Sequence, residues 1–219
     1  MEDIRTIELT FVNVYLIKVK DLFILIDTGL AIHWERLESE LINAGCLPDK
    51  LKLVLITHGD FDHTGNCAKL KEKYKCRIAM HNDDVPIVEQ GVVVKRKMKS
   101  FRNKIFFLVR SLLRKKFIID RFSPDILLSD GQRLDEYGFN AQVVHIAGHT
   151  KGSIGILTGN GNFFAGDTFT NRQEPDTASI IENQTELNKS LTKLKNMDIK
   201  MVYPGHGKPF EMGKIIGKL

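Results

Sequence analysis

The sequence has few cysteines and lacks long apolar runs, and both shortages exclude classes of protein. Its 219 residues include three cysteines, Cys46, Cys67 and Cys76, and no CxxC pair. An odd count without such a pair argues against a disulfide framework and favours a reducing compartment. No apolar stretch approaches the roughly 20 residues of a membrane-spanning helix, and the opening MEDIRTIELTF lacks the basic-then-apolar order of a signal peptide. We therefore expect a cytoplasmic protein.

Acidic residues are almost absent from one segment, 92–121. Eleven Lys and Arg residues against a single acid, Asp120, give this segment about +10, whereas the whole chain carries +5. The rest of the chain is therefore mildly acidic, and the basic character belongs to one place on the surface. The length suffices for one sizeable core and is short for two. We predict a single domain over residues 1–219 with a basic helical insertion at about 84–125.

The order of the expected elements suggests two similar halves. Strand-like segments IELTF, VYLIKV and LFILID come first, followed by a helix-like WERLESELINAG and the apolar run LVLI at 53–56. A helix over about 64–74 and the strand RIAMH complete the first half. The hairpin-like DILLSDGQRLDEYG, three short strands, a helix over roughly 184–196 and a last strand, KMVYP, make up the second. Each half is expected to be a sheet with helices on its outer face.

Four of these apolar segments run into a loop that carries histidine or aspartate. The loops are THGDFDH after LVLI, AGHT after VVHI, GDT after NFFA, and GHG after MVYP. Imidazole and carboxylate together suit Zn²⁺, Fe or Mn²⁺. Too many candidates are present for one tetrahedral ion, but they suit two ions that share a bridging carboxylate. The seven candidate ligands are His58, Asp60, Asp62, His63, His149, Asp167 and His206.

These pieces resemble the metallo-β-lactamase fold superfamily of metallo-hydrolases. The family signature is HxHxDH followed by a His in a GHT loop, an Asp in a GDT loop and a last His in a GH loop, and all four occur here in that order, together with a DTG at 27–29. The resemblance implies an α+β fold, a four-layer αββα sandwich of two mixed sheets with outer helices. It also implies two divalent ions, with Zn²⁺ preferred and Fe or Mn²⁺ as alternatives. The first ion would be held by His58, position 60 and His149, the second by Asp62, His63 and His206, and Asp167 would bridge them.

Position 60 departs from the family, because HGDFDH has Asp60 where the signature has its second histidine. Three interpretations stay open. Asp60 binds the first metal through its carboxylate, which would shift the preference toward Fe or Mn²⁺. Alternatively, Asp60 is too short to reach the ion, or the site is degenerate and inactive.

The resemblance implies metal-assisted hydrolysis. A hydroxide bridging the two ions would attack the substrate, and Asp62 would act as the catalytic residue by orienting it and accepting its proton. The first hypothesis is cleavage of an ester, thioester or lactone in a small molecule. A phosphodiesterase on nucleic acid or lipid, an iron-dependent redox enzyme, and a binding protein with a decayed site are the alternatives. The oligomeric state is not determined by the sequence.

The basic segment 92–121 has a broad apolar arc at helical spacing with Lys and Arg mostly opposite. We expect a lid or wall near the site, packed on its own domain or on a dimer partner. Contact with an anionic membrane surface or lipid is a second interpretation, and a track for a nucleic-acid backbone is a weaker third. Among the remaining histidines, His33 and His81 are expected to be surface or capping residues. His145 is expected either to support a metal ligand by a hydrogen bond or to lie in the core or rim.

Overall fold

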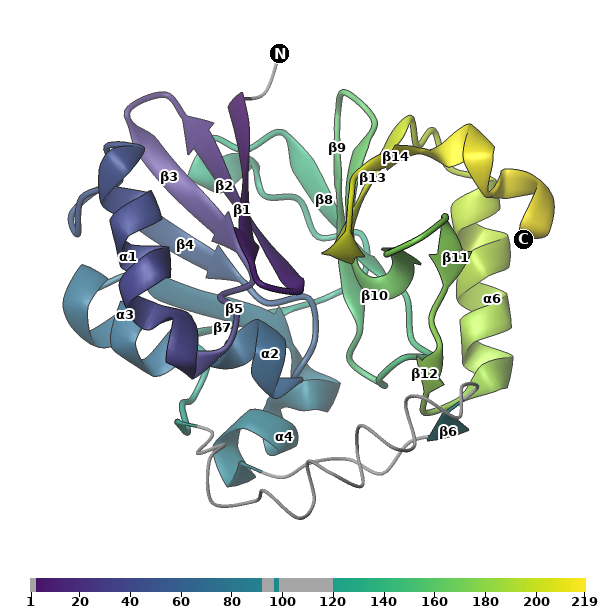
Figure 1. Ribbon diagram of the computed structural model, residues 1–219, viewed down its shortest axis with the longest axis horizontal. Helices are drawn as coiled ribbons and strands as arrows, with labels where there is room; N and C mark the ends of the chain where they lie inside the picture. The colour runs from purple at the N-terminus through teal and green to yellow at the C-terminus, as the bar shows by residue number, and fades with distance from the viewer. Residues whose placement is uncertain (1–2, 92–96, 99–119) are drawn as a thin grey trace.

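The computed structural model describes residues 3–91, 97–98 and 120–219, with only the backbone described at 97–98. Figure 1 shows two sheets packed face to face, with helices on the outer side of each. Most of the basic segment 92–121, including its predicted helix, lies outside the described residues. Among the described residues no helix is long and apolar enough to cross a membrane.

The first sheet collects strands from the N-terminal part of the chain. The three N-terminal strands pair antiparallel, and the remaining ones continue in parallel from the third. Four of the five residues of LKLVL are buried because both faces of this strand are covered. In spatial order the strands are β1 (Asp3–Leu9), β2 (Val12–Val19), β3 (Leu22–Ile26), β4 (Leu51–Leu55), β5 (Arg77–His81) and β7 (Ile126–Leu128).

The second sheet is also mixed. Its members pair antiparallel except β10 and β13, which run parallel. The spatial order is β14 (Phe210–Glu211), β13 (Met201–Gly207), β10 (Asn162–Asn171), β9 (Ile154–Thr158) and β8 (Ala141–His145), with β11 (Asp176–Thr177) beside β10. A separate two-stranded pair joins β12 (Ile180–Ile181) to β6 (Lys97–Met98).

The helices cover the outer faces of both sheets. Asn183 caps the longest one, because its side-chain oxygen accepts from the backbone N–H groups of Thr185 and Glu186. The helices are α1 (Trp34–Asn43), α2 (Phe61–Thr64), α3 (Cys67–Tyr74), α4 (Val85–Gln90) and α6 (Gln184–Lys195). Short 3₁₀ turns are η1 (Ala31–His33), η2 (Asn82–Asp84), η4 (Asp135–Tyr137), η5 (Met212–Lys214) and η6 (Ile216–Lys218).

Three buried apolar clusters define the layers. One cluster joins the outer face of the first sheet to α1 and α3, through residues such as Leu37 and Leu70. A second fills the space between the sheets, where Ile24 and Leu53 from one sheet meet Ile156 from the other. A third packs α6 on the second sheet. The structure therefore confirms the predicted α+β class, a four-layer αββα sandwich of two mixed sheets.

Two local expectations were wrong. The segment DILLSDGQRLDEYG is not a hairpin, because β7 pairs in parallel with β5 and η4 follows it. Asp125 holds this arrangement in place, since its carboxylate accepts from the backbone N–H of Ile78 and from the Lys71 ammonium. The helix expected over 64–74 is broken into α2 and α3, and α2 begins earlier, at Phe61.

Candidate metal centre

All seven candidate ligands lie together at one edge of the sandwich. The loop after β4 provides His58 and Asp60, and α2 provides Asp62 and His63. Three overlapping groups, each with its ligand atoms within 4.8 Å of one another, connect the whole set. They are His58, Asp60 and His149; His58, His63 and Asp167; and Asp62, His63 and His206. These seven residues are called the candidate centre below.

Two of the seven lie inside strands and not in loops after them. Asp167 is in the middle of β10 and His206 is near the end of β13, and the pairing of these strands shifts register around Gly166. Such bulges re-aim side chains beside functional sites. Gly205 permits the close approach, since a Cβ there would lie 2.5 Å from Asp167 Oδ1 and 2.7 Å from His63 Cε1.

The His58 and His63 rings have their orientation fixed through one carboxylate, that of Asp27. The Nδ1–H of His63 donates to Asp27 Oδ2 at 2.8 Å. The Thr57 hydroxyl donates to the same carboxylate, so its oxygen accepts from His58 Nδ1–H at 3.0 Å. When neutral, both rings therefore keep the Nε2 lone pair for the interior of the centre. These two Nε2 atoms and Asp167 Oδ1 are buried without a hydrogen-bond partner.

The other two rings are fixed by backbone carbonyls. His149 Nδ1–H donates to the carbonyl of Ile180 at 2.7 Å, and His206 Nδ1–H donates to the carbonyl of Phe11. A carbonyl can only accept, so each ring again presents an unprotonated Nε2 when neutral. Metal-binding histidines in proteins almost always donate their other ring nitrogen in this way. When neutral, all four imidazoles of the centre thus have the same tautomer.

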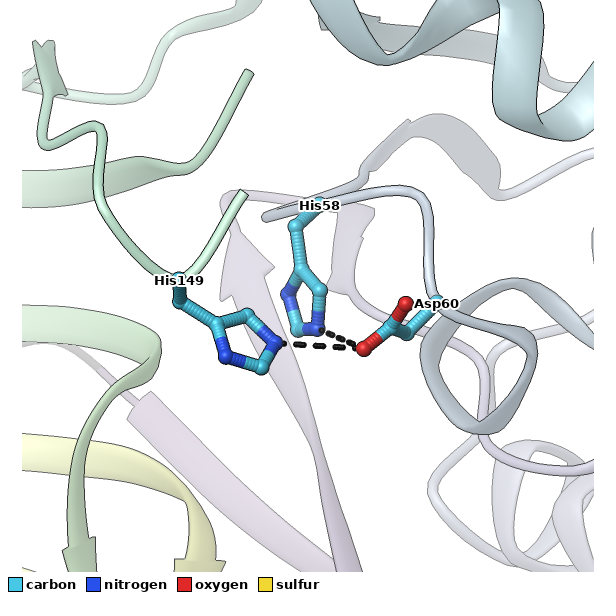
Figure 2. Close-up of side chains that lie close together, drawn as sticks. All are labelled: His58, Asp60 and His149. Carbon is cyan, nitrogen blue, oxygen red and sulfur yellow. Dashed lines mark hydrogen bonds and ion pairs between the residues drawn. The ribbon is translucent and has the colours of Figure 1, made fainter. Parts of the chain in front are cut away.

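Each Nε2 faces a carboxylate at a spacing that suits a shared ion. Asp60 Oδ2 lies 3.1 Å from His149 Nε2 and 3.5 Å from His58 Nε2. Figure 2 shows the Asp60 carboxylate pointing toward both rings. Asp167 lies 3.3 Å from His63 Nε2 and 3.2 Å from His206 Nε2, and Asp62 is 3.6 Å from the latter. Ligand atoms about 2.0–2.2 Å from a tetrahedral ion would be roughly 3.3–3.6 Å apart. The distances therefore match two N/O sites, and the Asp60 carboxylate is near enough to belong to one.

Without an ion, the pKa values of the ligand side chains shift in different directions. Burial and the neighbouring His63 lower the pKa of His58, so this ring is neutral near pH 7. Burial would raise the pKa of Asp167, but the imidazoles of His206 and His63 hold it well below its usual range. Against the effect of burial, Asp27 and Asp167 raise the pKa of His63, and Asp167 raises that of His206. A divalent ion would therefore displace a proton from each of these two rings. The donor set of the centre fits divalent cations that accept imidazole and oxygen.

A second supporting carboxylate, that of Asp84, was not predicted from the sequence. Asp84 is 1% exposed. It accepts from the backbone N–H of Gly59 at 2.7 Å, from that of Gly152 at 2.8 Å and from the Thr150 hydroxyl at 2.8 Å. It therefore connects the loop of His58 and Asp60 to the loop of His149. An acidic residue after a strand gives no signal of this role, because both partner loops are distant in sequence.

The chain is similar in sequence to known metallo-hydrolases. A family model described as "Metallo-beta-lactamase superfamily" matches residues 7–206. The probable metallo-hydrolase MJ0888 of Methanocaldococcus jannaschii is 28% identical over 84% of this chain and 82% of its own length. The hydroxyacylglutathione hydrolase GloC of Haemophilus influenzae is 29% identical over 49% of this chain and 44% of its own. Human acyl-coenzyme A thioesterase MBLAC2 is 23% identical over 65% of this chain and 52% of its own.

Solved structures share the whole architecture. The metallo-β-lactamase family protein TTHA1429 of Thermus thermophilus aligns over 99% of this chain and 77% of its own, with a TM-score of 0.75 and 19% identity. At this identity the likeness concerns the fold alone. TTHA1623, solved in a di-iron-bound form, aligns over 97% of this chain and 96% of its own, with a TM-score of 0.73 and 25% identity.

Proposed function

Because the chain belongs to the metallo-β-lactamase superfamily, we propose that it is a metal-dependent hydrolase that cleaves an ester, thioester or lactone bond in a small molecule. The observation that carries this proposal is the common tautomer of four histidines, whose Nε2 atoms all face carboxylates. That orientation is the one that a metal site needs. Ligand histidines require it, because only the lone pair binds an ion.

We assign two adjacent sites to the candidate centre. His58, Asp60 and His149 would hold the first divalent ion, most simply Zn²⁺. Asp62, His63 and His206 would hold the second, and Asp167 would serve both. With ions bound there, the centre would supply a water of lowered pKa, near 7, and a Lewis acid for the oxygen of a substrate carbonyl.

The chain's own residues supply orientation and proton acceptance. Asp27 and the carbonyls of Ile180 and Phe11 fix the rings, so the ligand geometry exists before substrate arrives. Asp62 is assigned as the catalytic residue, because its carboxylate lies in the centre at 14% side-chain exposure. It can accept a proton from the attacking water there. Asp84 holds together the two loops that form the first site.

The relatives support the substrate class. GloC is named as a hydroxyacylglutathione hydrolase and MBLAC2 as an acyl-coenzyme A thioesterase, so two of the similar proteins bear names of acyl hydrolases. Each match spans about half of those proteins, and the transfer of substrate class to this chain is part of the proposal. The phosphodiesterase alternative and the contact with an anionic membrane surface or lipid depend on segment 92–121, and both stay predictions.

The proposal is tested by parallel assays on the Zn²⁺-loaded and Mn²⁺-loaded protein. We expect turnover of a generic thioester, and loss of that turnover together with metal occupancy in His149→Ala and Asp167→Ala. Turnover of bis(p-nitrophenyl) phosphate alone would favour the phosphodiesterase. Full thioester activity in either variant would refute the assignment of the centre.

An iron-dependent redox enzyme is the second candidate. Asp60 makes the first group a two-histidine, one-carboxylate set, a pattern typical of non-haem iron sites, and TTHA1623 is known in a di-iron-bound form. Elemental analysis of protein purified without added metal separates the two candidates. Zinc without iron would exclude the iron-dependent redox enzyme.

A further inference from the structure

A second group of metal-ligand side chains lies outside the candidate centre. His81 is at the end of β5, His145 is at the end of β8, and Asp83 is in η2. One ligand atom from each lies within 4.8 Å of the other two. The two imidazoles come from different sheets and stack in parallel, with ring centroids 4.2 Å apart and planes 6° from parallel.

The hydrogen bonds of this group determine its tautomers. His145 Nε2 lies 2.8 Å from the carbonyl of Lys151, so Nε2 carries the proton and Nδ1 keeps its lone pair. His81 Nδ1 accepts from the backbone N–H of Asp83 at 3.2 Å, so it is unprotonated too, and this bond confirms the predicted capping role of His81. Asp83 Oδ2 lies 4.0 Å from the same Nδ1.

We propose that His81, His145 and Asp83 form a third divalent-metal site, separate from the candidate centre and suited to an imidazole-preferring ion such as Zn²⁺. The His145 bond to the Lys151 carbonyl is the support that a ligating histidine normally has at its other nitrogen. Three protein ligands leave the fourth tetrahedral position to water. The Asp83 side chain is 48% exposed, so the group lies at the surface, where water can reach it.

Ion binding requires a small rearrangement of the stacked pair. Imidazole lone pairs lie in the ring plane, so two parallel rings must tilt before both Nδ1 atoms point at one ion. His81 would exchange its bond from the Asp83 N–H for a bond to the ion. Burial and the adjacent His145 ring lower the pKa of His81, so the ring is already neutral near pH 7. Asp130 adds negative charge nearby, bonded to the His145 N–H and to Lys193.

The position of the site connects it to the candidate centre. The His145 side chain bonds to the carbonyl of Lys151. His145 is the last residue of β8, and Lys151 lies in the following loop, which also carries His149. Asp83 is adjacent to Asp84, which holds the same loop through Thr150 and Gly152. A third ion would therefore brace the His149 loop from outside without contacting the seven residues of the centre.

The test is a Zn²⁺ titration of protein already loaded with two equivalents, with bound metal measured by equilibrium dialysis. We expect a third equivalent in the wild type, at least tenfold weaker binding of it in His81→Gln or His145→Gln, and its loss in the double variant. His33→Gln is the matched control, because His33 bonds to Thr10 outside this group, and the third equivalent should persist there. The proposal would be overturned if the wild type bound no third equivalent of Zn²⁺, or if the double variant still bound one.

A measurement on the wild type alone guards against misfolded variants. Nitrogen-15 NMR of the histidine rings should show Zn²⁺-dependent shifts at Nδ1 of His145 and His81, with the Nε2 proton of His145 retained. Unchanged Nδ1 signals at saturating Zn²⁺ would contradict the site, whatever the substitutions do.

Discussion

At the scale of single residues, Asp60 distinguishes this chain from the signature that it otherwise follows. Its carboxylate oxygen lies within 3.5 Å of Nε2 atoms on both His58 and His149. This distance argues against the interpretation that an aspartate is too short to reach the first site. The carboxylate also brings a negative charge and a harder donor where an imidazole would be neutral.

Replacing Asp60 therefore measures its contribution directly. Asp60→His should raise the affinity of the first site for Zn²⁺ by roughly tenfold, about 1.4 kcal/mol, because imidazole suits Zn²⁺ whereas carboxylate suits harder ions such as Mn²⁺ and Mg²⁺. Asp60→Ala, the paired variant, should lower it. Competition with a chromophoric chelator provides the affinities. Identical Zn²⁺ affinity in all three proteins would mean that Asp60 does not bind the metal.

At the scale of elements, Asp84 in η2 unites loops that β4 and β8 would otherwise present independently. Its two oxygens accept three hydrogen bonds, from Gly59, Thr150 and Gly152. Because the group is buried, each lost bond leaves a donor without a partner. The loops of the first site thus depend on a residue that binds no metal itself.

Asp84→Asn should therefore weaken both the fold and the first site. The amide presents its NH₂ group to one set of these donors, and we expect a loss of about 1–3 kcal/mol in the free energy of unfolding. Urea denaturation of the metal-free protein measures this loss, and Asp49→Asn at an exposed position is the control. Zn²⁺ affinity should fall more in the first site than in the second. If Asp84→Asn kept the wild-type free energy of unfolding and changed the Zn²⁺ affinity of both sites equally, the role of Asp84 would be contradicted.

Individual strands were easier to predict from the sequence than the way in which they pair. The apolar runs LFILID and LVLI were predicted as strands, and they correspond to β3 and β4. LVLI was recognisable because burial on both faces leaves a continuous apolar signature. The pairing of β7 was predicted wrongly, because three residues carry too little pattern to distinguish a hairpin from an edge strand beside β5. The bulge at Gly166 was not predicted either, since register depends on the neighbouring strand.

At the scale of the whole molecule, the candidate centre joins the two sheets. His58, Asp60, Asp62 and His63 follow strands of the first sheet, whereas His149, Asp167 and His206 belong to the second. Ions bound there would connect the two halves of the sandwich, so binding should favour the folded state by mass action.

Metal should accordingly raise the thermal stability. With free Zn²⁺ at 100 times the dissociation constant, one site contributes about 2.7 kcal/mol, and differential scanning calorimetry should show a clear rise in Tm. Asp167→Asn should reduce that rise, because Asp167 faces histidines of both sites. A Tm independent of Zn²⁺, or an equal rise in the variant, would show that the ions do not bridge the halves.

The sequence by itself determined the superfamily, the layered fold and the seven candidate ligands, because strand-end motifs and residue chemistry are local properties. Only the tertiary structure decided how those ligands are oriented. Three of the four histidine supports come from groups 31 to 195 residues away: the Asp27 carboxylate and the carbonyls of Ile180 and Phe11. Every residue has a backbone carbonyl, so no sequence pattern marks the one that folding places beside an imidazole.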